Sequence, residues 1–250
     1  MSYKVYNNKS IFELPKAVIF DTDNTLYPYL PAHKAASKAL AVKANKLLGI
    51  PIKLFNSEFE KARKEIKLRL GSNASSHSRL LYIQRTIELL GVNSQLLLTL
   101  DLEQTYWRTF LQTCNLYPGI KELLLKLQDL NITTAIITDL TSQIQFRKII
   151  FFGLEDFFDF IVTSEESGFD KPNNASFKLA IEKLGICPSK CWMIGDNLNA
   201  DIKGANDFGL ISIHKNENNR NYKYENIIPD ISFDNFSSLI NLISKVEKGL

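Results

Sequence analysis

The chain has 250 residues, enough for one large α/β domain or for a core with an inserted module, and a chain of this size buries roughly 70–75% of its unfolded surface. Hydrophobic residues make up 45% of it and the formal net charge is +3, which argues against disorder and against strong electrostatic binding of nucleic acid. The amino terminus lacks the apolar core of a signal peptide, and no 18-residue window is apolar without charge. We therefore expect a cytoplasmic protein with no membrane segment and no nucleic-acid partner.

The first predicted strand, residues 16–21, is an apolar run that ends in two carboxylates, Asp21 and Asp23. Asn24 and the prolines that follow predict a loop directly after it. Two carboxylates this close repel each other unless they share a cation or a proton, so the pair favours a site for a divalent metal. The alternative is an ordinary Asp/Asn turn that closes a strand.

A block of long amphipathic helices follows the first strand. Glycines stand where C-terminal caps are expected, and Ser75 and Ser94 stand where N-caps are expected. The predicted helices span residues 32–48, 52–70, 76–90 and 94–113. We interpret residues 27–114 as an all-helical cap domain inserted into an α/β core domain made of residues 1–26 and 115–250.

From Pro118 onward, helices alternate with short apolar strands. Helices are predicted at 119–130, 142–151, 173–185, 199–208 and 235–247, and strands at 132–138, 160–163, 191–195, 210–213 and near 230–233. Short, continuously apolar strands separated by helices indicate a doubly wound parallel sheet covered on both faces. Ligands of such α/β sheets bind at the carboxyl ends of the strands.

Polar side chains follow several of these strands at that edge. Thr138 and Asp139 follow one strand, Asp196 and Asp201 follow another, and Lys171 precedes a predicted helix. Taken singly, Asp196 could be a helix N-cap and Lys171 a surface lysine. Taken with the first motif, an ammonium group and a helix amino terminus that face several carboxylates suit an anionic substrate and a hard metal ion.

Four motifs in this order resemble those of the haloacid dehalogenase (HAD) superfamily of phosphatases, subfamily I, with a helical cap after the first strand. The motifs are Asp21-Thr22-Asp23-Asn24-Thr25-Leu26, Ile136-Ile137-Thr138, Asp170-Lys171-Pro172, and the run from Gly195 to Asp201. The resemblance covers residues 15 to 248 and implies a Rossmann-like, doubly wound parallel sheet.

The resemblance also implies roles for these residues. Asp21 would be the nucleophile that forms an aspartyl-phosphate, and Asp23 would protonate the leaving group and then activate water. Thr138 and Lys171 would bind the phosphoryl oxygens. Mg²⁺ would be held by Asp21, the backbone carbonyl of Asp23 and Asp196, with Asp201 close by or as a further ligand.

Asp139 departs from the family pattern, which commonly has asparagine after the threonine of the second motif. We interpret Asp139 as a substrate-binding or structural feature that leaves catalysis intact. In the cap, Tyr27, Tyr29, His33 and Arg79 are candidates for substrate contact, although aromatic residues beside Pro28 and Pro31 most often pack the hinge between cap and core, and His33 stands near a helix start.

The expected function is therefore that of a Mg²⁺-dependent phosphomonoester hydrolase acting on a small soluble phosphate ester, either a nucleotide or a sugar phosphate. A phosphosugar mutase of the same fold and a non-catalytic ligand-binding member are the alternatives. We expect a monomer or a homodimer. The three cysteines are odd in number and lack the ligand pairs of a zinc site, so free thiols are expected.

Overall fold

The computed structural model describes residues 3–7, 13–216 and 226–249. The chain divides into two compact units, an α/β unit of Met1–Tyr27 with Leu116–Leu250 and a helical unit of Pro28–Asn115. None of the helices in the described part of the chain combines the length and the apolar character that crossing a membrane requires. None of the cysteines Cys114, Cys187 and Cys191 is in a disulfide, as predicted.

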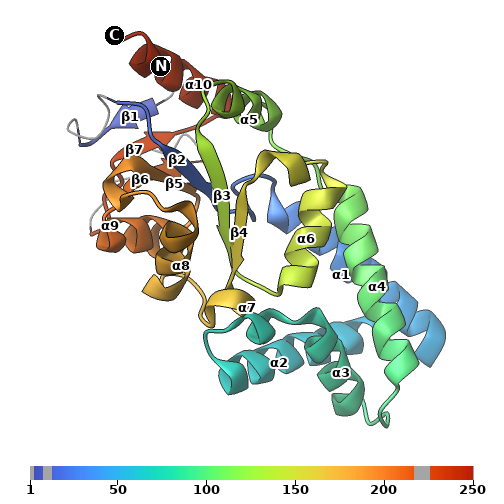
Figure 1. Cartoon of the computed structure of the whole chain (residues 1–250). Helices are drawn as coiled ribbons and strands as arrows, with labels where there is room; N and C mark the ends of the chain where they lie inside the picture. Colours follow the sequence, from blue (N-terminus) through green and yellow to red (C-terminus); the bar gives the residue numbers. More distant parts are fainter. Residues whose placement is uncertain (1–2, 8–12, 217–225, 250) are drawn as a thin grey trace. The chain divides into compact units, whose positions relative to one another are not determined.

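Within the described residues, seven strands form one sheet in the order β1-β7-β6-β5-β2-β3-β4 (Figure 1). Every pairing is parallel except that of β1 with β7 at the edge, so the predicted parallel α/β sheet is confirmed. The strands are β1 (Tyr3–Val5), β2 (Ala17–Phe20), β3 (Thr133–Thr138), β4 (Phe160–Thr163), β5 (Cys191–Gly195), β6 (Ile211–Lys215) and β7 (Ile231–Phe233).

Strand β2 lies between β3 on one side and β5 on the other. From β2 the chain builds the sheet outward through β3 and β4, then returns to the other side of β2 for β5 and β6. The strand order therefore reverses next to β2, and this reversal is the switch point at which open α/β sheets bind ligands. The loop that begins at Asp21 lies at the carboxyl end of this central strand.

Helices cover the sheet because its strands are apolar on both faces. Ala17, Ile19, Ala135 and Ile137 project from one face into a core completed by Phe177 and its neighbours from α8 and α9. Elsewhere in the α/β unit, helices α5 and α10 pack against each other, away from this core (Figure 1). The α-helices of this unit are α5 (Ile120–Asp129), α6 (Ser142–Phe151), α7 (Ser164–Ser167), α8 (Asn174–Leu184), α9 (Gly204–Phe208) and α10 (Phe236–Glu247).

Two features of the α/β unit differ from what the sequence predicted. Strand β1 was not predicted, because three residues of mixed polarity carry no period-two signal. The predicted helix over 199–208 is a π-helical turn, Leu198–Lys203, followed by the short helix α9. Asn197 begins this turn, since its side chain accepts hydrogen bonds from the backbone N–H groups of Asn199 and Ala200.

The helical unit contains four long helices, and α1 and α4 pack closely along each other. Ser78, not the predicted Ser75, caps α3, because residues 74–77 form a separate 3-10 turn. Gln95 rather than Ser94 precedes α4. The helices are α1 (Tyr29–Leu48), α2 (Ile52–Leu70), α3 (Arg79–Leu89) and α4 (Leu96–Thr113).

Three of the four residues considered for substrate contact lie in an aromatic cluster of the helical unit. The Arg79 guanidinium lies 5.4–6.0 Å from the ring centroids of four aromatic side chains, and it also donates a hydrogen bond to the hydroxyl of Tyr29. The Nδ1 atom of His33 is 2.7 Å from the Tyr106 hydroxyl oxygen. These contacts give Tyr29, His33 and Arg79 a packing role within the unit.

Burial in this cluster, reinforced by the charges of Arg79 and Arg63, lowers the pKa of His33 to about 4. The ring therefore stays neutral in the folded unit where an unfolded chain would protonate it, at a pKa of about 6.5. The helical unit should lose stability as the pH falls from about 6.5 to about 4, because protons then bind the unfolded chain preferentially. A nuclear magnetic resonance titration checks this: His33 should titrate near pH 4 in the native protein and near pH 6.5 in urea. A native value near 6.5 would contradict the half-buried, neutral imidazole.

Candidate active site

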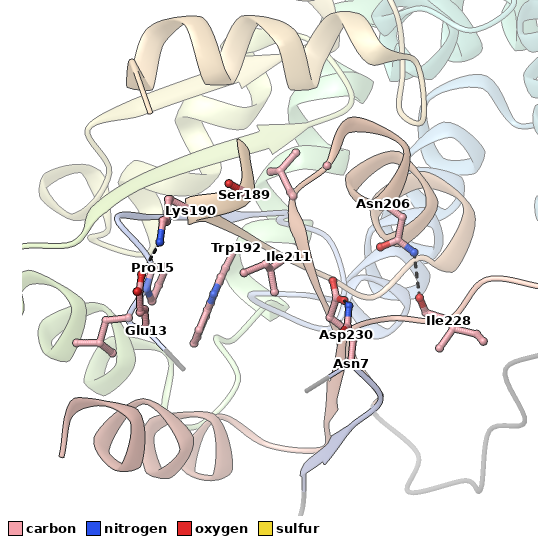
Figure 2. Close-up of a pocket in the computed structure, with 13 residues that line it drawn as sticks. Asn7, Glu13, Pro15, Ser189, Lys190, Trp192, Asn206, Ile211, Ile228 and Asp230 are labelled. Carbon is pink, nitrogen blue, oxygen red and sulfur yellow. Dashed lines mark hydrogen bonds and ion pairs between the residues drawn. The ribbon is translucent and has the colours of Figure 1, made fainter. Parts of the chain in front are cut away.

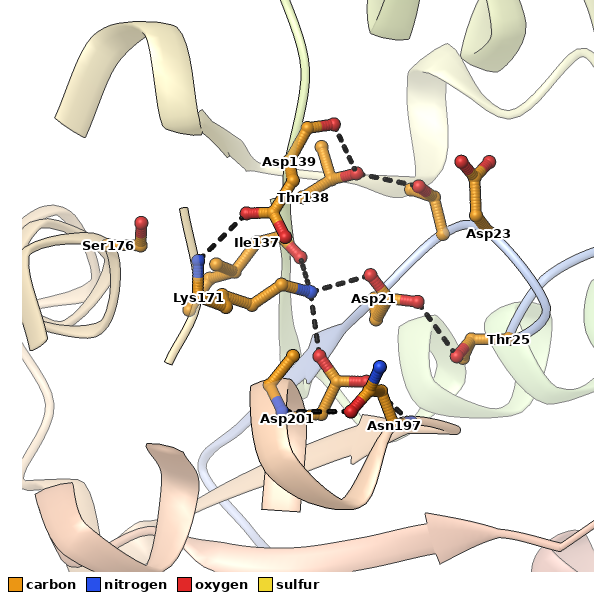
Figure 3. A network of polar contacts seen from close by, with 12 residues as sticks. Asp21, Asp23, Thr25, Ile137, Thr138, Asp139, Lys171, Ser176, Asn197 and Asp201 are labelled. Carbon is orange, nitrogen blue, oxygen red and sulfur yellow. Dashed lines mark hydrogen bonds and ion pairs between the residues drawn. The ribbon is translucent and has the colours of Figure 1, made fainter. Parts of the chain in front are cut away.

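The polar residues predicted to meet at one edge of the sheet do meet there. Asp21 follows β2, Thr138 ends β3, and Asp196 follows β5, so neighbouring parallel strands bring all three to the same edge. Figure 3 shows Asp21, Thr138, Lys171 and Asp201 converging on this edge from four segments. The sheet therefore assembles the site from residues up to 180 positions apart, as Asp21 and Asp201 are.

Lys171 is the centre of this network. Its ammonium group is 2.6 Å from Asp21 Oδ1 and 2.7 Å from Asp201 Oδ1, and it also donates to the backbone carbonyl of Ile137 at 3.0 Å. Only 7% of Lys171 is exposed, so it is not an ordinary surface lysine. Although burial opposes it, the carboxylates of Asp201 and Asp21 raise the pKa of Lys171 well above its usual value. The lysine is therefore a permanent cation at the site.

The carboxylates at this edge outnumber the ammonium group that faces them. One oxygen from each of Asp21, Asp196 and Asp201 can be chosen so that all three lie within 4.8 Å of one another. Burial raises the pKa of Asp21 to about 7 against the attraction of Lys171, and burial together with Asp21 raises that of Asp196 to about 8. Both shifts arise first from burial, which penalises the charged carboxylates, and a bound cation would offset that penalty. Three carboxylates that face one ammonium group offer the hard oxygen donors that a divalent cation such as Mg²⁺ prefers.

Hydrogen bonds fix the carboxylates of Asp21 and Asp201. Asp21 Oδ2 accepts from the Thr25 hydroxyl at 3.0 Å, and Asp201 Oδ2 accepts from the backbone N–H of Asn197 at 3.0 Å. Asn197, and not Asp196, caps the following turn, so the cap interpretation of Asp196 was wrong. The backbone carbonyl of Asp196 accepts a hydrogen bond of 3.0 Å from His214 Nε2. The side-chain carboxylate of Asp196 lies in the cluster with Asp21 and Asp201.

Asp139 directs its carboxylate to the backbone of the segment that carries Lys171. Its Oδ1 atom accepts a hydrogen bond of 3.0 Å from the backbone N–H of Lys171, and burial raises its pKa. This contact ties the loop after β3 to the segment that carries Lys171. The contact supports a structural role for Asp139. It also gives the carboxylate a hydrogen-bond donor at a position where the resembled family commonly has asparagine.

The loop after β3 has an unusual backbone. Leu140 has a φ of 99°, a region that non-glycine residues rarely occupy, and its N–H donates to the Ser164 hydroxyl at 2.9 Å. Gln145 supports the same loop, since its Nε2 donates to Thr138 Oγ1 at 2.8 Å and to the Asp139 carbonyl at 2.6 Å. The loop is therefore held in a strained conformation at the edge where the charges gather.

The structure also places residues at the site that the sequence analysis missed. Gln145 and Lys148 of α6 are both about 1% exposed, and Lys148 Nζ is 2.8 Å from Asp23 Oδ1. The buried positions of α6 are 144, 145, 148 and 149, so these two polar residues stand in the helix's apolar stripe. The sequence did offer one signal of a role for Gln145 and Lys148, namely two polar residues within the apolar stripe of a predicted helix. Such residues are rarely buried without partners.

A second cavity lies away from this site. It has a volume of about 590 Å³ and includes Trp192 and Ile211, which stand near the amino ends of β5 and β6 (Figure 2). Its charged side chains have partners: Glu13 pairs with Lys190, and Asp230 accepts hydrogen bonds from the Asn7 amide and the Ser212 backbone N–H. The charged edge and this cavity therefore belong to opposite ends of the strands.

Comparison with known proteins agrees with this geometry. The family model described as "haloacid dehalogenase-like hydrolase" matches residues 15–209. A ribulose-1,5-bisphosphate 5-phosphatase from Halopiger xanaduensis is 40% identical over 199 residues, which cover 79% of this chain and 83% of the relative. A glyceraldehyde 3-phosphate phosphatase from Methanothermobacter thermautotrophicus is 31% identical over 232 residues, which cover 91% of this chain and 99% of the relative.

A solved structure supports the fold. The 2-haloacid dehalogenase from Pseudomonas syringae pv. Tomato superposes with a TM-score of 0.75 at 24% identity, covering 93% of this chain and 99% of that one. At this identity the likeness shows the fold alone, whereas the phosphatase relatives and the family model bear on the kind of enzyme. On this evidence the chain belongs to the haloacid dehalogenase-like hydrolases and is a phosphatase of that family.

Proposed function

We propose that this phosphatase is a Mg²⁺-dependent phosphomonoester hydrolase of small sugar phosphates that works through an aspartyl-phosphate on Asp21. The observation that carries the proposal is the placement of Asp21 against the buried Lys171, at the sheet edge where the other carboxylates gather. A carboxylate attacks an anionic phosphate only if their mutual repulsion is removed, and a fixed ammonium group supplies part of that charge.

In the first proposed step, a carboxylate oxygen of Asp21 forms a bond to phosphorus while the bond from phosphorus to the leaving-group oxygen breaks. Asp23, in its acid form, gives that oxygen a proton. In the second step water attacks the same phosphorus, Asp23 takes a proton from the water, and the bond to Asp21 breaks. Inorganic phosphate leaves and both aspartates return to their initial state.

The phosphoryl oxygens need donors at the same edge. We assign this role to Lys171 and to Thr138, whose hydroxyl oxygen is 2.7 Å from that of Thr22. Asp139 would contribute through its backbone and through its hold on the Lys171 segment. These groups lie at the carboxyl ends of the strands, where α/β sheets bind phosphate ligands.

The metal would be held by Asp21, Asp196 and the backbone carbonyl of Asp23, with Asp201 close by or as a further ligand. The three side-chain carboxylates offer the hard oxygen donors that Mg²⁺ prefers. When bound, Mg²⁺ supplies positive charge that offsets the repulsion between Asp21 and the phosphate.

The choice of sugar phosphates is supported by the relatives, whose names refer to ribulose 1,5-bisphosphate and glyceraldehyde 3-phosphate. We further propose that residues 27–114 act as a separate domain that selects the leaving group. The compactness of the helical unit, Pro28–Asn115, supports this division.

Hydrolysis of a substrate panel tests the proposed function. With Mg²⁺, the protein should release phosphate from three- to five-carbon sugar phosphates faster than from nucleotides, and a chelator should abolish release. Asp21→Asn should lower turnover by ~10³-fold or more, because an amide cannot form the intermediate. Asp129→Asn, an exposed change at the end of α5, is the matched control and should leave turnover intact. An active Asp21→Asn protein would refute the assigned nucleophile.

Calcium should inhibit the magnesium-supported reaction. Ca²⁺ accepts more oxygen ligands at longer distances than Mg²⁺, so both oxygens of a carboxylate can bind it and Asp21 is then unable to attack. Titration of CaCl₂ against a fixed Mg²⁺ concentration should reduce phosphate release, and added Mg²⁺ should restore it. Equal activity with either metal would count against the proposed ligand set.

Removing Lys171 should destabilise the α/β unit as well as stop catalysis. Lys171→Met leaves Asp21 and Asp201 buried without their counter-charge, which costs about 3–5 kcal/mol of unfolding free energy. Adding Asp201→Asn should recover part of that loss. Urea unfolding followed by fluorescence in a Trp107→Phe background checks this, because Trp192 then reports on the α/β unit alone. Additive losses in the double variant would show that the two residues do not interact.

A further inference from the structure

Helix α6 carries a buried lysine that no motif marks. Lys148 is 1% exposed and stands in the part of the helix that faces the core. Lysine is almost never this buried unless it is paired, because removing an ammonium group from water is costly. A buried ion pair is weak evidence of a contribution to stability, since an apolar residue of similar volume often serves as well. The position of Lys148 therefore points to a role in the chemistry of its partner.

That partner is Asp23. The Nζ atom of Lys148 is 2.8 Å from Asp23 Oδ1, and the Tyr27 hydroxyl donates to the same oxygen at 2.5 Å. Lys148 Nζ also lies 5.6 Å from the centroid of the Tyr27 ring, so the three groups form one cluster. The ring of Tyr27 is itself stacked on Phe152, at 5.0 Å between centroids. Two donors from two different segments thus converge on one carboxylate oxygen.

The same loop is held by two further lysines. Lys171 contacts Asp21, and the ammonium group of Lys215, which is 3% exposed, donates to the Asn24 carbonyl at 2.9 Å. The three lysines come from different parts of the α/β unit, yet each contacts a different residue of the segment 21–24. The contact of Lys148 is with the carboxylate of Asp23.

We infer that Lys148, together with Tyr27, is a positioning residue that holds the carboxyl group of Asp23 in place for proton transfer to and from the substrate. The inference rests on the proposed role of Asp23 as acid and base. In the first step the proton moves from Asp23 to the leaving-group oxygen as its bond to phosphorus breaks. This transfer needs the two oxygens within hydrogen-bond reach, and a misplacement of about 1 Å can cost ~10²-fold in rate.

The leaving group gives a signature that a purely structural lysine would not produce. A sugar alkoxide is a poor leaving group and needs the proton, whereas p-nitrophenolate is stable as an anion and leaves without one. Misplacing Asp23 should therefore slow the first step for a sugar phosphate and leave the first step for p-nitrophenyl phosphate nearly unchanged. General disruption of the site would slow both.

The experiment compares the wild type with Lys148→Met and Tyr27→Phe in single-turnover and burst measurements with Mg²⁺. The sugar substrate is the best ester of the panel above. Lys148→Met should slow its first turnover by ~10- to 100-fold, while the burst of p-nitrophenol should stay within about threefold of wild type. Tyr27→Phe should show the same pattern with a smaller loss. Lys126→Met, which removes an ion pair with Glu247 outside the site, should change neither rate.

A double variant tests whether Lys148 acts through Asp23. In an Asp23→Asn protein the carboxyl group is already lost, so adding Lys148→Met should slow the sugar phosphate no further. Equal slowing of both substrates by Lys148→Met, no slowing of either, or a full additional loss in the double variant would overturn the inference while leaving the proposed function in place. A wild-type protein that hydrolyses no ester would overturn the proposed function and the inference with it.

Discussion

The buried contact of Lys171 with Asp21 and Asp201 is the interaction on which the rest of the site depends. Each carboxylate would be costly to bury alone, and the ammonium group between them at 2.6 and 2.7 Å makes their approach possible. The contact joins the loop after β2, the segment before α8 and the turn after β5. The proposed phosphate site thus has one fixed positive charge in place before any ligand arrives.

The position of β2 in the sheet makes this contact geometrically possible. Because β2 lies between β3 and β5, the loop that carries Asp21 is flanked by the ends of two strands that occur more than a hundred residues later in the chain. The side chains of Lys148, Lys171 and Lys215 then approach this loop from other parts of the α/β unit. The loop is short, yet contacts from several distant elements determine its conformation.

Several features of the site could be predicted from the sequence, and others could not. Asp21, Thr138, Lys171 and Asp201 follow or precede strong apolar segments in recognisable motifs, and the structure brings them to one edge. Asp196 was open to interpretation as a helix cap until Asn197 was seen to fill that position. Lys148 and Gln145 carry no motif, and only their positions in the buried stripe of α6 hint at a function. Their significance depends on what lies opposite them, which local patterns do not encode.

The sequence by itself determined the class of fold and the order of its parts, because periodicity and turn residues act over a few neighbouring positions. It also determined which residue types would stand at the ends of the strands. Only the tertiary structure decided which of them meet: that Asp139 turns to the backbone of Lys171, and that Lys148 and Tyr27 share one oxygen of Asp23. These contacts join residues of different segments, and their existence depends on strand register and helix packing that no local pattern specifies.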